Sequence, residues 1–465
     1  MRLEPVRSIE EVEDYRASLR GRDVAVIGAG RSGLATMRRL AEAGARVRLA
    51  DAQSRSELVS AAQEASGLGA VLVEEFERFE QIRGVDLVVS SPGIPWEHEA
   101  LADARAAAVE TFGTMEFAWR LCASPVIAVT GTNGKGTVCR MLSGMLTSAG
   151  IEHILAGNIG LPLADRLDAT APDVPAIVEV SSFQLETIVD FRPRVATLLN
   201  LAPDHLDRHP TFAAYAAAKA RIFENQRPDD LAVINEDDEA SRRLAEETAA
   251  QKLRVSLRTD GLDAGVFDGQ FFVRSQGATE PVCAASDLPL PGRHHMTNAL
   301  VAAVIARHVG AEVEAIAEGI RGYVPPRHHM ELVAEVGGVQ FINDSKASNP
   351  ESATADLGAM QRPFVAIVGG KDKGADFSAL AELLSDRARA VILIGEAADR
   401  IERMLSGGAV ERADTLEAAV KRAYELSGPG WAVIMAPACS SFDMFRNYEF
   451  RGEAFRKAAA ALKRD

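Results

Sequence analysis

The chain has 465 residues, about three times the length of an average domain, so two or three domains are expected. Hydrophobic residues make up 47% and charged residues 25%, which is typical of a globular protein with a sizeable core. The formal net charge of −15 argues against a non-specific nucleic-acid binder, since such proteins neutralise phosphates with clustered basic residues. A small anionic ligand remains compatible, because it needs only a local positive pocket.

The first residues lack the apolar core of a signal peptide, and no apolar run approaches the ~18 residues of a membrane span. The four cysteines stand far apart and form no CxxC pair, which disfavours a zinc ribbon or a disulfide framework. We therefore expect a reduced, soluble, cytoplasmic protein.

Short apolar runs alternate with helix-length amphipathic stretches along the chain, which predicts an α/β fold with mostly parallel sheets. The expected strands are Asp23–Ile27, Val47–Ala50, Asp86–Val89, Pro125–Val129, Ala176–Val180, Val195–Leu199, Leu231–Ile234, Phe364–Val368, Ala390–Ile394 and Trp431–Met435. The expected helices include Gly33–Ala43, Thr137–Ala149, Phe212–Asn225 and Asn298–Val309. The segment Ala264–Ala284 has the pattern of hairpin-like β structure instead.

Two breaks divide this pattern. A new strand-turn-helix unit starts at Pro125, after an expected helix around Thr114–Cys122. A proline pair within Tyr323–Arg327 ends the helix that precedes it. We therefore expect three domains, spanning residues 1–114, 115–325 and 326–465.

The first expected strand leads into a G-x-G-x-x-G loop formed by Gly28, Gly30 and Gly33. In this pattern the first glycine permits a tight turn, the second lets a ligand approach the backbone, and the following helix offers free N–H groups to a phosphate. Asp51, at the end of the next strand, is where an acidic residue would meet a ribose hydroxyl. The loop predicts a nucleotide-type ligand, and a plain βαβ turn is the alternative interpretation.

A second glycine-rich loop, T-G-T-N-G-K-G-T over Thr130–Thr137, also stands between a strand and a helix. Backbone N–H groups and a lysine at a helix start form a phosphate cradle. The loop departs from the G-x-x-x-x-G-K-[ST] pattern, because position 129 is Val129 and the lysine is followed by Gly136. Two phosphate loops on two sheets indicate an enzyme that uses ATP on a second, nucleotide-bearing substrate.

Glu179 and His205 each follow an expected strand downstream of the second loop. Ligands of open α/β sheets bind at the carboxyl ends of the strands, so both side chains are expected to face the phosphates. A carboxylate there can hold Mg²⁺, which prefers hard oxygen ligands. Lys219 lies within a helix among alanines, where a solvated lysine is the simpler interpretation.

Three strand-end loops of the C-terminal region carry lysines and hydroxyls, which together suit a compact dianion such as a dicarboxylate. These loops are Asp344–Pro350, Gly369–Gly374 and Ala436–Asp443. Two histidine pairs, His294-His295 and His328-His329, also stand out. Neighbouring residues of a helix do not share a face, so we expect neither pair to form a metal site.

At this point the combination of motifs resembles the Mur ligases, ATP-dependent amide-bond ligases of peptidoglycan precursor assembly, over nearly the whole chain. Thr130–Lys135 is similar to the family's T-G-T-N-G-K loop, and Asn158–Gly160 and Asp204–His205 are shared with the wider family. Three segments resemble the D-glutamate-adding members: Glu179–Glu186, Asp344–Asn349 and Pro437–Phe445.

The resemblance implies a Rossmann-like N-terminal domain for a UDP-sugar, a central P-loop-type ATPase domain with a mostly parallel sheet, and a Rossmann-like C-terminal domain for an amino acid. It implies that D-glutamate is joined to the alanyl carboxylate of UDP-N-acetylmuramoyl-L-alanine through an acyl phosphate, with release of ADP and phosphate. The implied cofactors are ATP and Mg²⁺. We expect a monomer with no nucleic-acid partner and no membrane insertion.

The same resemblance assigns roles to individual residues. The implied catalytic residues are Lys135, Glu179, His205 and Lys219. The implied ATP-binding residues are Gly131, Thr132, Asn133, Gly134, Lys135, Gly136, Thr137, Asn298, His329 and Asp344. The implied UDP-sugar-binding residues are Arg31, Ser32, Asp51, Ser91, Gly93, Asn158, Gln184 and His205. The implied D-glutamate-binding residues are Lys346, Ser348, Lys373, Ser441 and Tyr448. The implied metal ligands are Thr137, Glu179, His205 and Lys219, where Lys219 corresponds to the family's carbamylated lysine.

Five positions depart from the family's pattern, two of them mildly, since Ser348 and Tyr448 replace the more usual Thr and Phe. Gly136 stands where the family usually has Ser or Thr, so Thr137 would have to supply the hydroxyl. His329 replaces the arginine of an H-R-x-E pattern, which weakens the expected contact with ATP. His295 replaces a common asparagine.

Other functions remain open on the sequence. A nicotinamide-dependent oxidoreductase would use the first glycine-rich loop, but it leaves the second unexplained. A nucleotide-sensing regulator or scaffold with a degenerate ATP site would explain Gly136 and His329. Another amide ligase of the superfamily would add a diamino acid, or add glutamates to folate.

Overall fold

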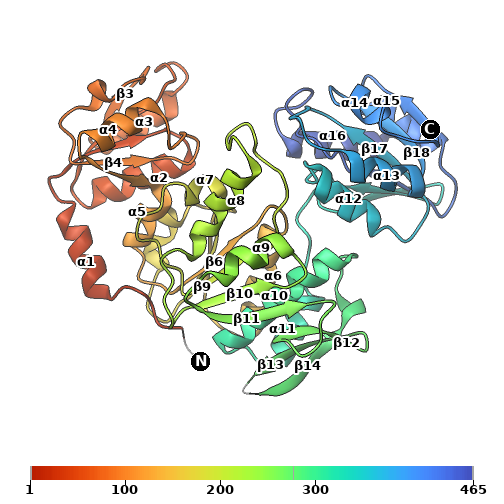
Figure 1. Cartoon of the computed structure of the whole chain (residues 1–465). Coiled ribbons are helices and arrows are strands. Elements are labelled where there is room, and N and C mark those ends of the chain that lie inside the picture. Colours follow the sequence, from red (N-terminus) through yellow and green to blue (C-terminus); the bar gives the residue numbers. More distant parts are fainter. Residues whose placement is uncertain (1–2, 276, 463–465) are drawn as a thin grey trace. The chain divides into compact units, whose positions relative to one another are not determined.

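Figure 1 shows the computed structural model of the chain, which describes residues 3–275 and 277–462. Its contacts form two compact units. The first unit comprises the chain up to Leu201 together with residues 208–285 and 297–322. The second comprises residues 202–207, residues 286–296 and the chain from Tyr323 onward. The expected division into three domains stays a prediction, since two of the three sheets share the first unit.

The first sheet is five-stranded and parallel, with strand order β3-β2-β1-β4-β5. Its strands are β1 (Asp23–Ile27), β2 (Arg46–Ala50), β3 (Val71–Val73), β4 (Leu87–Ser90) and β5 (Glu110–Gly113). Its helices are α1 (Ile9–Ser18), α2 (Arg31–Glu42), α3 (Val59–Gly67), α4 (Glu99–Ala106) and α5 (Thr114–Arg120). This order places the first glycine-rich loop at the carboxyl end of the central strand β1.

The second sheet has nine strands in the order β14-β13-β12-β11-β10-β9-β6-β8-β7. Its strands are β6 (Val126–Thr130), β7 (Ile154–Gly157), β8 (Ala176–Glu179), β9 (Val195–Leu198), β10 (Leu231–Asn235), β11 (Gln251–Ser256), β12 (Ala264–Phe267), β13 (Gln270–Ser275) and β14 (Ala278–Ala284). The helices of this region are α6 (Lys135–Ser148), α7 (Ser182–Leu185), α8 (Phe212–Ala220), α9 (Glu239–Glu246), α10 (Arg293–Val309) and α11 (Val313–Arg321). Only β12, β13 and β14 pair antiparallel, which confirms the expected hairpin-like segment.

The third sheet has six strands in the order β15-β16-β20-β17-β18-β19, and only β15 and β16 pair antiparallel. Its strands are β15 (Glu331–Val336), β16 (Val339–Asn343), β17 (Phe364–Gly369), β18 (Ala388–Ile394), β19 (Ala409–Arg412) and β20 (Ala432–Met435). Its helices are α12 (Pro350–Gly358), α13 (Ser378–Arg387), α14 (Ala398–Glu402), α15 (Leu416–Glu425) and α16 (Tyr448–Ala461).

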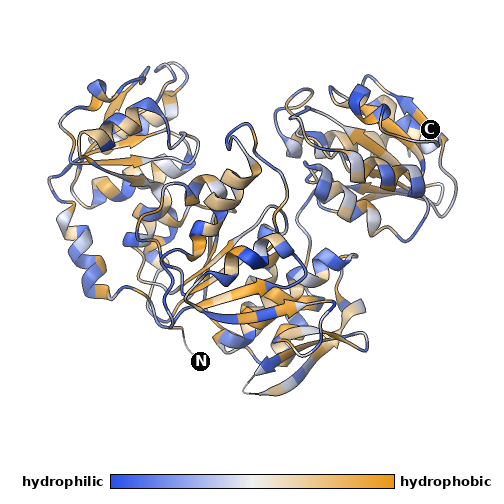
Figure 2. Ribbon diagram, in the orientation of Figure 1, coloured by the Kyte–Doolittle hydropathy of each residue, from blue (hydrophilic) through white to orange (hydrophobic). Residues whose placement is uncertain are grey.

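The central strands are mostly apolar, as expected for strands covered on both faces (Figure 2), and β6 and β8 each end in one polar residue, Thr130 and Glu179. Every residue of β6, β8, β17 and β20 is buried. The predicted α/β class is confirmed, and each expected strand is present within two residues of its predicted bounds. The expected helix Phe212–Asn225 is shorter than predicted, because α8 ends at Ala220 and a 3₁₀ turn follows.

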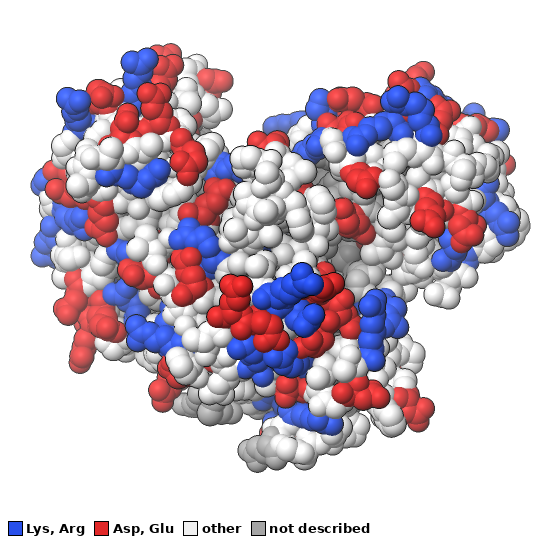
Figure 3. Space-filling view, viewed as in Figure 1, with Lys and Arg blue, Asp and Glu red and all other residues white. Residues whose placement is uncertain are grey.

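The cysteines and the lengths of the apolar helices can also be compared with the sequence-based expectations. All four cysteines are buried, and within the part of the chain that the structure describes none of them forms a disulfide, as their spacing suggested. Among the described residues, no helix is both long enough and apolar enough to cross a membrane. Acidic and basic side chains are interspersed on the face drawn in Figure 3, so the net negative charge does not gather there in one block.

A buried carboxylate joins the first two sheets within the first unit. Glu116 of α5 has no solvent exposure and accepts hydrogen bonds from the backbone N–H groups of residues 189–191, at 2.9, 3.1 and 2.9 Å. It also receives Arg120 Nε at 2.9 Å. Three N–H donors and a guanidinium compensate the loss of water around the charge.

We expect Glu116→Gln to lower the free energy of unfolding by about 3–5 kcal/mol, because an amide keeps the volume but leaves buried donors unpaired. Glu110→Gln is the matched control. That side chain is 41% exposed and pairs with Arg22 and Arg120, so its loss should cost less than about 1 kcal/mol. Urea denaturation of both variants measures the difference, and equal losses would contradict a special role for Glu116.

Candidate active site

The conformation of the loop that follows β6 depends on two glycines and one asparagine. Gly131 has φ of +152° and Gly134 has φ of +85°, both outside the range that L side chains readily adopt. The loop is anchored to Asn200, whose Oδ1 accepts the Asn133 N–H at 2.9 Å and whose Nδ2 donates to Asn133 O at 3.0 Å. The helix α6 then begins at Lys135 without a side-chain cap, so its first N–H groups face the loop's interior.

Two lysine ammonium groups converge on one carbonyl of this loop. Lys135 Nζ donates to Gly131 O at 2.9 Å, and Lys219 Nζ of α8 donates to the same oxygen at 2.7 Å. Lys219 is only 2% exposed, and it also lies 3.4 Å from Thr130 Oγ1. The interpretation of Lys219 as a solvated helix residue is therefore wrong. Two positive charges at a helix N-terminus make a strong anion-binding centre.

Glu179 ends β8 beside this loop, since it pairs in register with Val129 of β6. Its side chain is 6% exposed, and its Oε1 accepts the Asn158 Nδ2 hydrogen bond at 2.8 Å. The hydroxyl-bearing Thr137 is buried in the first turn of α6. These oxygen donors, next to the two lysines, are of the kind that Mg²⁺ prefers.

Asn298 of α10 closes the same loop from the opposite side. An ideal Cβ built on Gly134 would lie 2.5 Å from Asn298 Oδ1, so only a glycine fits this approach. Asn298 is 5% exposed and was predicted as an ATP-binding residue. The first unit thus brings together the predicted residues of the loop, Glu179, Lys219 and Asn298.

The glycine-rich loop after β1 also leaves no space for a side chain at two glycines of its pattern, Gly28 and Gly33. Gly28 has φ of +95°, and a Cβ on Gly33 would lie 1.9 Å from Gly28 O. Asp51 Oδ2 accepts the Ala29 N–H at 2.7 Å, and Ser91 Oγ donates to Gly28 O at 2.9 Å. In this structure Asp51 and Ser91 therefore shape the loop, while the N-terminus of α2 stays uncapped by any side chain.

Other predicted UDP-sugar residues gather around this loop in the first unit. Ser32 and Gln184 line one small pocket, together with Pro162 and Thr114. Arg31 donates a hydrogen bond to the backbone oxygen of Gly160, in the segment that follows β7. Gly93 O accepts a long hydrogen bond of 3.4 Å from Arg208 Nη1.

A pocket of the second unit contains part of the predicted amino-acid site. Ser348 and Lys373 line it, as does His205. Ser441 is buried but does not line the pocket, whereas its neighbour Ser440 does. Tyr448 is 38% exposed at the start of α16. Two of the predicted residues, Ser348 and Lys373, thus line this pocket, and Ser441 does not; their role in binding the amino acid stays a prediction.

Arg451 was missed by the sequence reasoning, although it organises these loops. It is 1% exposed, and its guanidinium donates to Ser345 O and to Cys439 O, both at 2.9 Å. Burial lowers the pKa of Arg451 to about 10 and raises the pKa of Cys439 to about 12. An arginine among polar helix residues carries no sequence signal for such a role.

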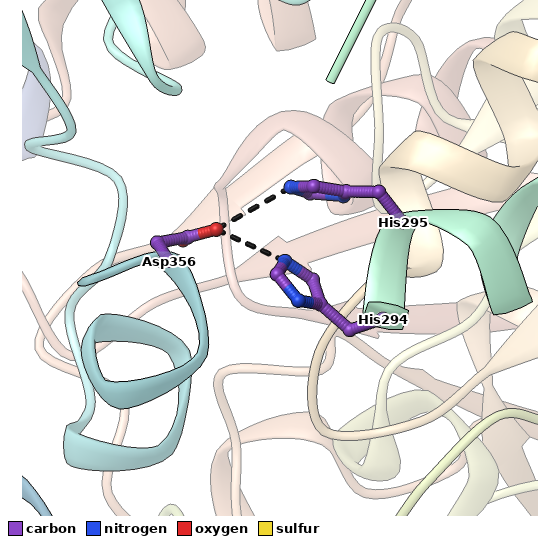
Figure 4. Close-up of side chains that lie close together, drawn as sticks. All are labelled: His294, His295 and Asp356. Atoms are coloured by element: carbon purple, nitrogen blue, oxygen red, sulfur yellow. Dashed lines mark hydrogen bonds and ion pairs between the residues drawn. The ribbon is translucent and has the colours of Figure 1, made fainter. Parts of the chain in front are cut away.

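Five ionisable side chains form a histidine–aspartate cluster in the second unit: His294, His295, His329, Asp344 and Asp356. His294 and His295 occupy the first turn of α10, with ring centroids 3.8 Å apart, and both approach Asp356 of α12 (Figure 4). The expectation that neighbouring helix residues cannot share a site is therefore wrong here. At a helix start, one ring can turn back toward the preceding loop and meet the other.

Burial is the largest influence on the pKa values of His295, His329, Asp344 and Asp356. Burial lowers the pKa of His329 to about 3 and also lowers the pKa of His295. Burial and the nearby Asp356 carboxylate raise the pKa of Asp344 well above its usual value. Burial opposes ionisation of Asp356 as well, but the His294 and His295 imidazoles beside it lower its pKa. The pKa values of the two carboxyls are thus shifted in opposite directions.

The chain matches three family descriptions along its length. Residues 22–113 match the N-terminal domain described as Mur ligase MurD-like, residues 129–306 the Mur ligase middle domain, and residues 328–439 the Mur ligase glutamate ligase domain. A relative named UDP-N-acetylmuramoylalanine--D-glutamate ligase, from Caldanaerobacter subterraneus, is 39% identical over 96% of this chain and 100% of its own length. The chain belongs to the Mur ligase family. Mur ligases are ATP-dependent enzymes that form amide bonds, so the expected enzyme class is confirmed.

Solved structures agree with this fold. A pseudomurein peptide ligase type C from Methanothermus fervidus superposes with a TM-score of 0.62 at 17% identity, covering 95% of this chain and 100% of its own. The UDP-N-acetylmuramate-alanine ligase of Thermotoga maritima gives a TM-score of 0.59 at 16% identity, with 95% and 99% covered. These likenesses establish a Mur ligase fold, and the family membership favours the ligase over the nicotinamide-dependent alternative.

We expect Gly134→Ala to weaken ATP binding by about tenfold or more, since the new Cβ displaces Asn298 from the loop. Gly150→Ala is the matched control, because Gly150 also has a positive φ of +66° but open space around it. Both variants carry the ~1–2 kcal/mol cost of a left-handed alanine. Calorimetric titration with ATP separates the two effects, and an equal loss of affinity in both would contradict the contact argument.

Proposed function

We propose that this chain joins D-glutamate to the alanyl carboxylate of UDP-N-acetylmuramoyl-L-alanine, using ATP and releasing ADP and phosphate, in peptidoglycan precursor synthesis. The observation that carries the proposal is the 39% identity, over the full length of the relative, to a protein named for this reaction. The segments that resemble the D-glutamate-adding members support it, since Ser348 and Ser440, from two of them, line one pocket of the second unit.

The ATP phosphates are assigned to the loop Gly131–Thr137. Its uncapped helix start and the ammonium of Lys135 suit the triphosphate charge, which Coulomb attraction favours in a partly buried setting. Asn298, His329 and Asp344 are assigned to the adenosine.

Mg²⁺ is assigned to Glu179, Thr137, His205 and Lys219. The carboxylate of Glu179 and the hydroxyl of Thr137 fit this ion's preference for hard oxygen ligands. Lys219 fits only as a carbamate, which would turn the buried ammonium into an anionic oxygen donor. When bound, Mg²⁺ offsets negative charge on the phosphate oxygens.

The UDP-sugar is assigned to the first sheet and its neighbours. The free N–H groups at the start of α2 suit a diphosphate. Arg31, Ser32, Ser91, Asn158 and Gln184 would line its path, together with Asp51, Gly93 and His205. We interpret Asp51 chiefly as a residue that positions the loop, because its carboxylate already accepts the Ala29 N–H.

The amino acid is assigned to the pocket of Ser348 and Lys373, together with Lys346, Ser441 and Tyr448. An ammonium and hydroxyls are suited to the two carboxylates of glutamate. Lys371 also lines this pocket, but its Nζ pairs with Glu396 at 2.6 Å. Lys373 is thus the better candidate for the side-chain carboxylate.

The chemistry proceeds in two displacements. An oxygen of the alanyl carboxylate attacks the γ-phosphorus of ATP, and the bond from that phosphorus to the ADP oxygen breaks. The D-glutamate amine then attacks the activated carbonyl carbon, loses a proton, and expels phosphate as the amide forms. Lys135 stabilises the transferring phosphoryl group by its charge. Excluding water matters because the acyl phosphate is hydrolysable.

The domains at 1–114, 115–325 and 326–465 are proposed as the binding regions for the UDP-sugar, ATP and the amino acid. The enzyme is proposed to act as a monomer in the cytoplasm, where ATP is available. The substrate-level alternative is another amide ligase of the superfamily, which differs only in the amino acid and acceptor.

We expect phosphate release from ATP to require both UDP-N-acetylmuramoyl-L-alanine and D-glutamate. A panel containing L-glutamate, L-lysine, meso-diaminopimelate and D-glutamate, assayed for released phosphate, tests the substrate. Release with a diamino acid but not with D-glutamate would reject the assignment. Binding of NADH without binding of ATP would instead favour an oxidoreductase, and no release with any amino acid would favour a regulator.

We expect Lys373→Met to raise the KM for D-glutamate by about tenfold or more, because it removes a charge-assisted contact worth ~1.5–3 kcal/mol. The KM for ATP should stay within twofold. Lys421→Met, an exposed lysine of α15 outside the pocket, serves as the control and should change neither constant. Steady-state kinetics with each substrate varied in turn measures both, and an unchanged KM for D-glutamate contradicts the role of Lys373.

A further inference from the structure

The histidine–aspartate cluster carries an inference beyond the proposed reaction. His294 Nε2 lies 3.0 Å and His295 Nε2 3.3 Å from the same atom, Asp356 Oδ1 (Figure 4). The ring centroid of His329 lies 5.2 Å from that of His295, in an edge-to-face arrangement. Asp344 completes the group at the end of β16.

The cluster leaves several buried polar atoms without a good hydrogen-bond partner. Neither ring nitrogen of His295 has a good hydrogen-bond partner, although its Nε2 is close to Asp356. His329 Nδ1 and Asp344 Oδ2 also lack a hydrogen-bond partner. His295, His329 and Asp344 are 2%, 7% and 0% exposed. Each unpaired buried group costs free energy, and such groups in a folded protein call for an explanation, among which is a bound ion.

The spacing of the donor atoms suits a metal ion. One candidate ligand atom from each of His294, His295 and Asp356 lies within 4.8 Å of the others, and the same is true of His329, Asp344 and Asp356. Ligands about 2.0–2.2 Å from a tetrahedral ion lie roughly 3.3 Å apart, close to the two distances to Asp356 Oδ1. Asp356 belongs to both groups and is thus the central ligand.

We propose that Asp356, with His294 and His295, binds one divalent transition-metal ion of the zinc class, and that His329 and Asp344 complete the surroundings of that ion. Imidazole and carboxylate donors favour Zn²⁺ and related ions, whereas Mg²⁺ prefers a set of oxygens. The ion would give partners to buried polar atoms of His295, His329 and Asp344 that otherwise lack one. It would also fix the first turn of α10 to α12.

This site is distinct from the Mg²⁺ position assigned above, although it shares His329 and Asp344 with the proposed adenosine contacts. If nucleotide and metal affect each other's affinity, the coupling must be reciprocal. Metal binding is measured without ATP and without turnover. The metal proposal can therefore fail while the proposed ligase function holds, and the ligase function can fail while the metal proposal holds.

The test uses the full-length chain, stripped of metal with a chelator and then titrated with Zn²⁺ by calorimetry in the presence of excess Mg²⁺. We expect one Zn²⁺ per chain with a dissociation constant in the micromolar range or tighter. Co²⁺ in place of Zn²⁺ should give the visible absorption of a four- or five-coordinate nitrogen–oxygen site. No binding by the stripped protein overturns the proposal.

Substitutions in the histidine–aspartate cluster test whether the ion binds there. Asp356→Asn should weaken Zn²⁺ binding by about a hundredfold, because it alters the shared ligand, and His294→Gln by about tenfold. His294 is partly exposed, so His294→Gln keeps the fold even if Asp356→Asn melts at a lower temperature. His153→Gln, a histidine that pairs with Ser143 in the first unit, is the control and should bind as the parent does. Undiminished binding in both cluster variants, or equal loss in His153→Gln, places the ion elsewhere and overturns the proposal.

Discussion

Two ammonium groups that share one backbone carbonyl are the constraint around which the first unit is organised. Lys135 and Lys219 come from different helices, yet both point at Gly131 O beside the uncapped start of α6. Like charges this close repel one another unless an anion lies between them or one of the lysines is modified. The positive φ values of Gly131 and Gly134 and the bonds to Asn200 hold the loop in the shape that keeps this charge in place.

The parallel sheets explain why residues distant in sequence serve common sites. Each strand ends where a loop begins, so the neighbouring strands β6 and β8 deliver their following residues to the same edge of the second sheet. The register between neighbouring strands then sets which residues lie at that edge. Glu179, for example, is the partner of Val129. In the third sheet β16, β17 and β20 are adjacent, and the loops that follow them supply Ser348, Lys373 and Ser440 to one pocket.

Most of the fold was predictable from the sequence, because buried parallel strands are apolar throughout and glycine-rich turns separate them. The short or half-exposed strands β3, β5, β7, β11, β15 and β19 were not predicted, since their burial is partial and their apolar runs are weak. The two phosphate-type loops were recognisable because backbone geometry demands glycine at defined positions. Chain order alone could not reveal that Lys219 is buried, because burial of a long polar side chain depends on what packs over its helix.

The histidine–aspartate cluster marks the limit of such reasoning. Adjacent histidines normally diverge on a helix, and Asp356 has no neighbour in sequence that signals a role. Their meeting depends on where α10 begins relative to α12, which is a tertiary fact. The departures at His295 and His329 were visible in the sequence, but only as isolated exceptions to a family pattern.

Arg451 shows how late in synthesis a binding pocket can become complete. It belongs to α16, yet its guanidinium links the loop at Ser345 to the loop at Cys439. While the chain emerges from the ribosome, the strands of the third sheet precede this brace, so both loops stay untethered until the final helix has left the exit tunnel. The first two sheets come earlier in the chain, so the pocket lined by Ser348 and Lys373 gains this brace after both of them have been synthesised.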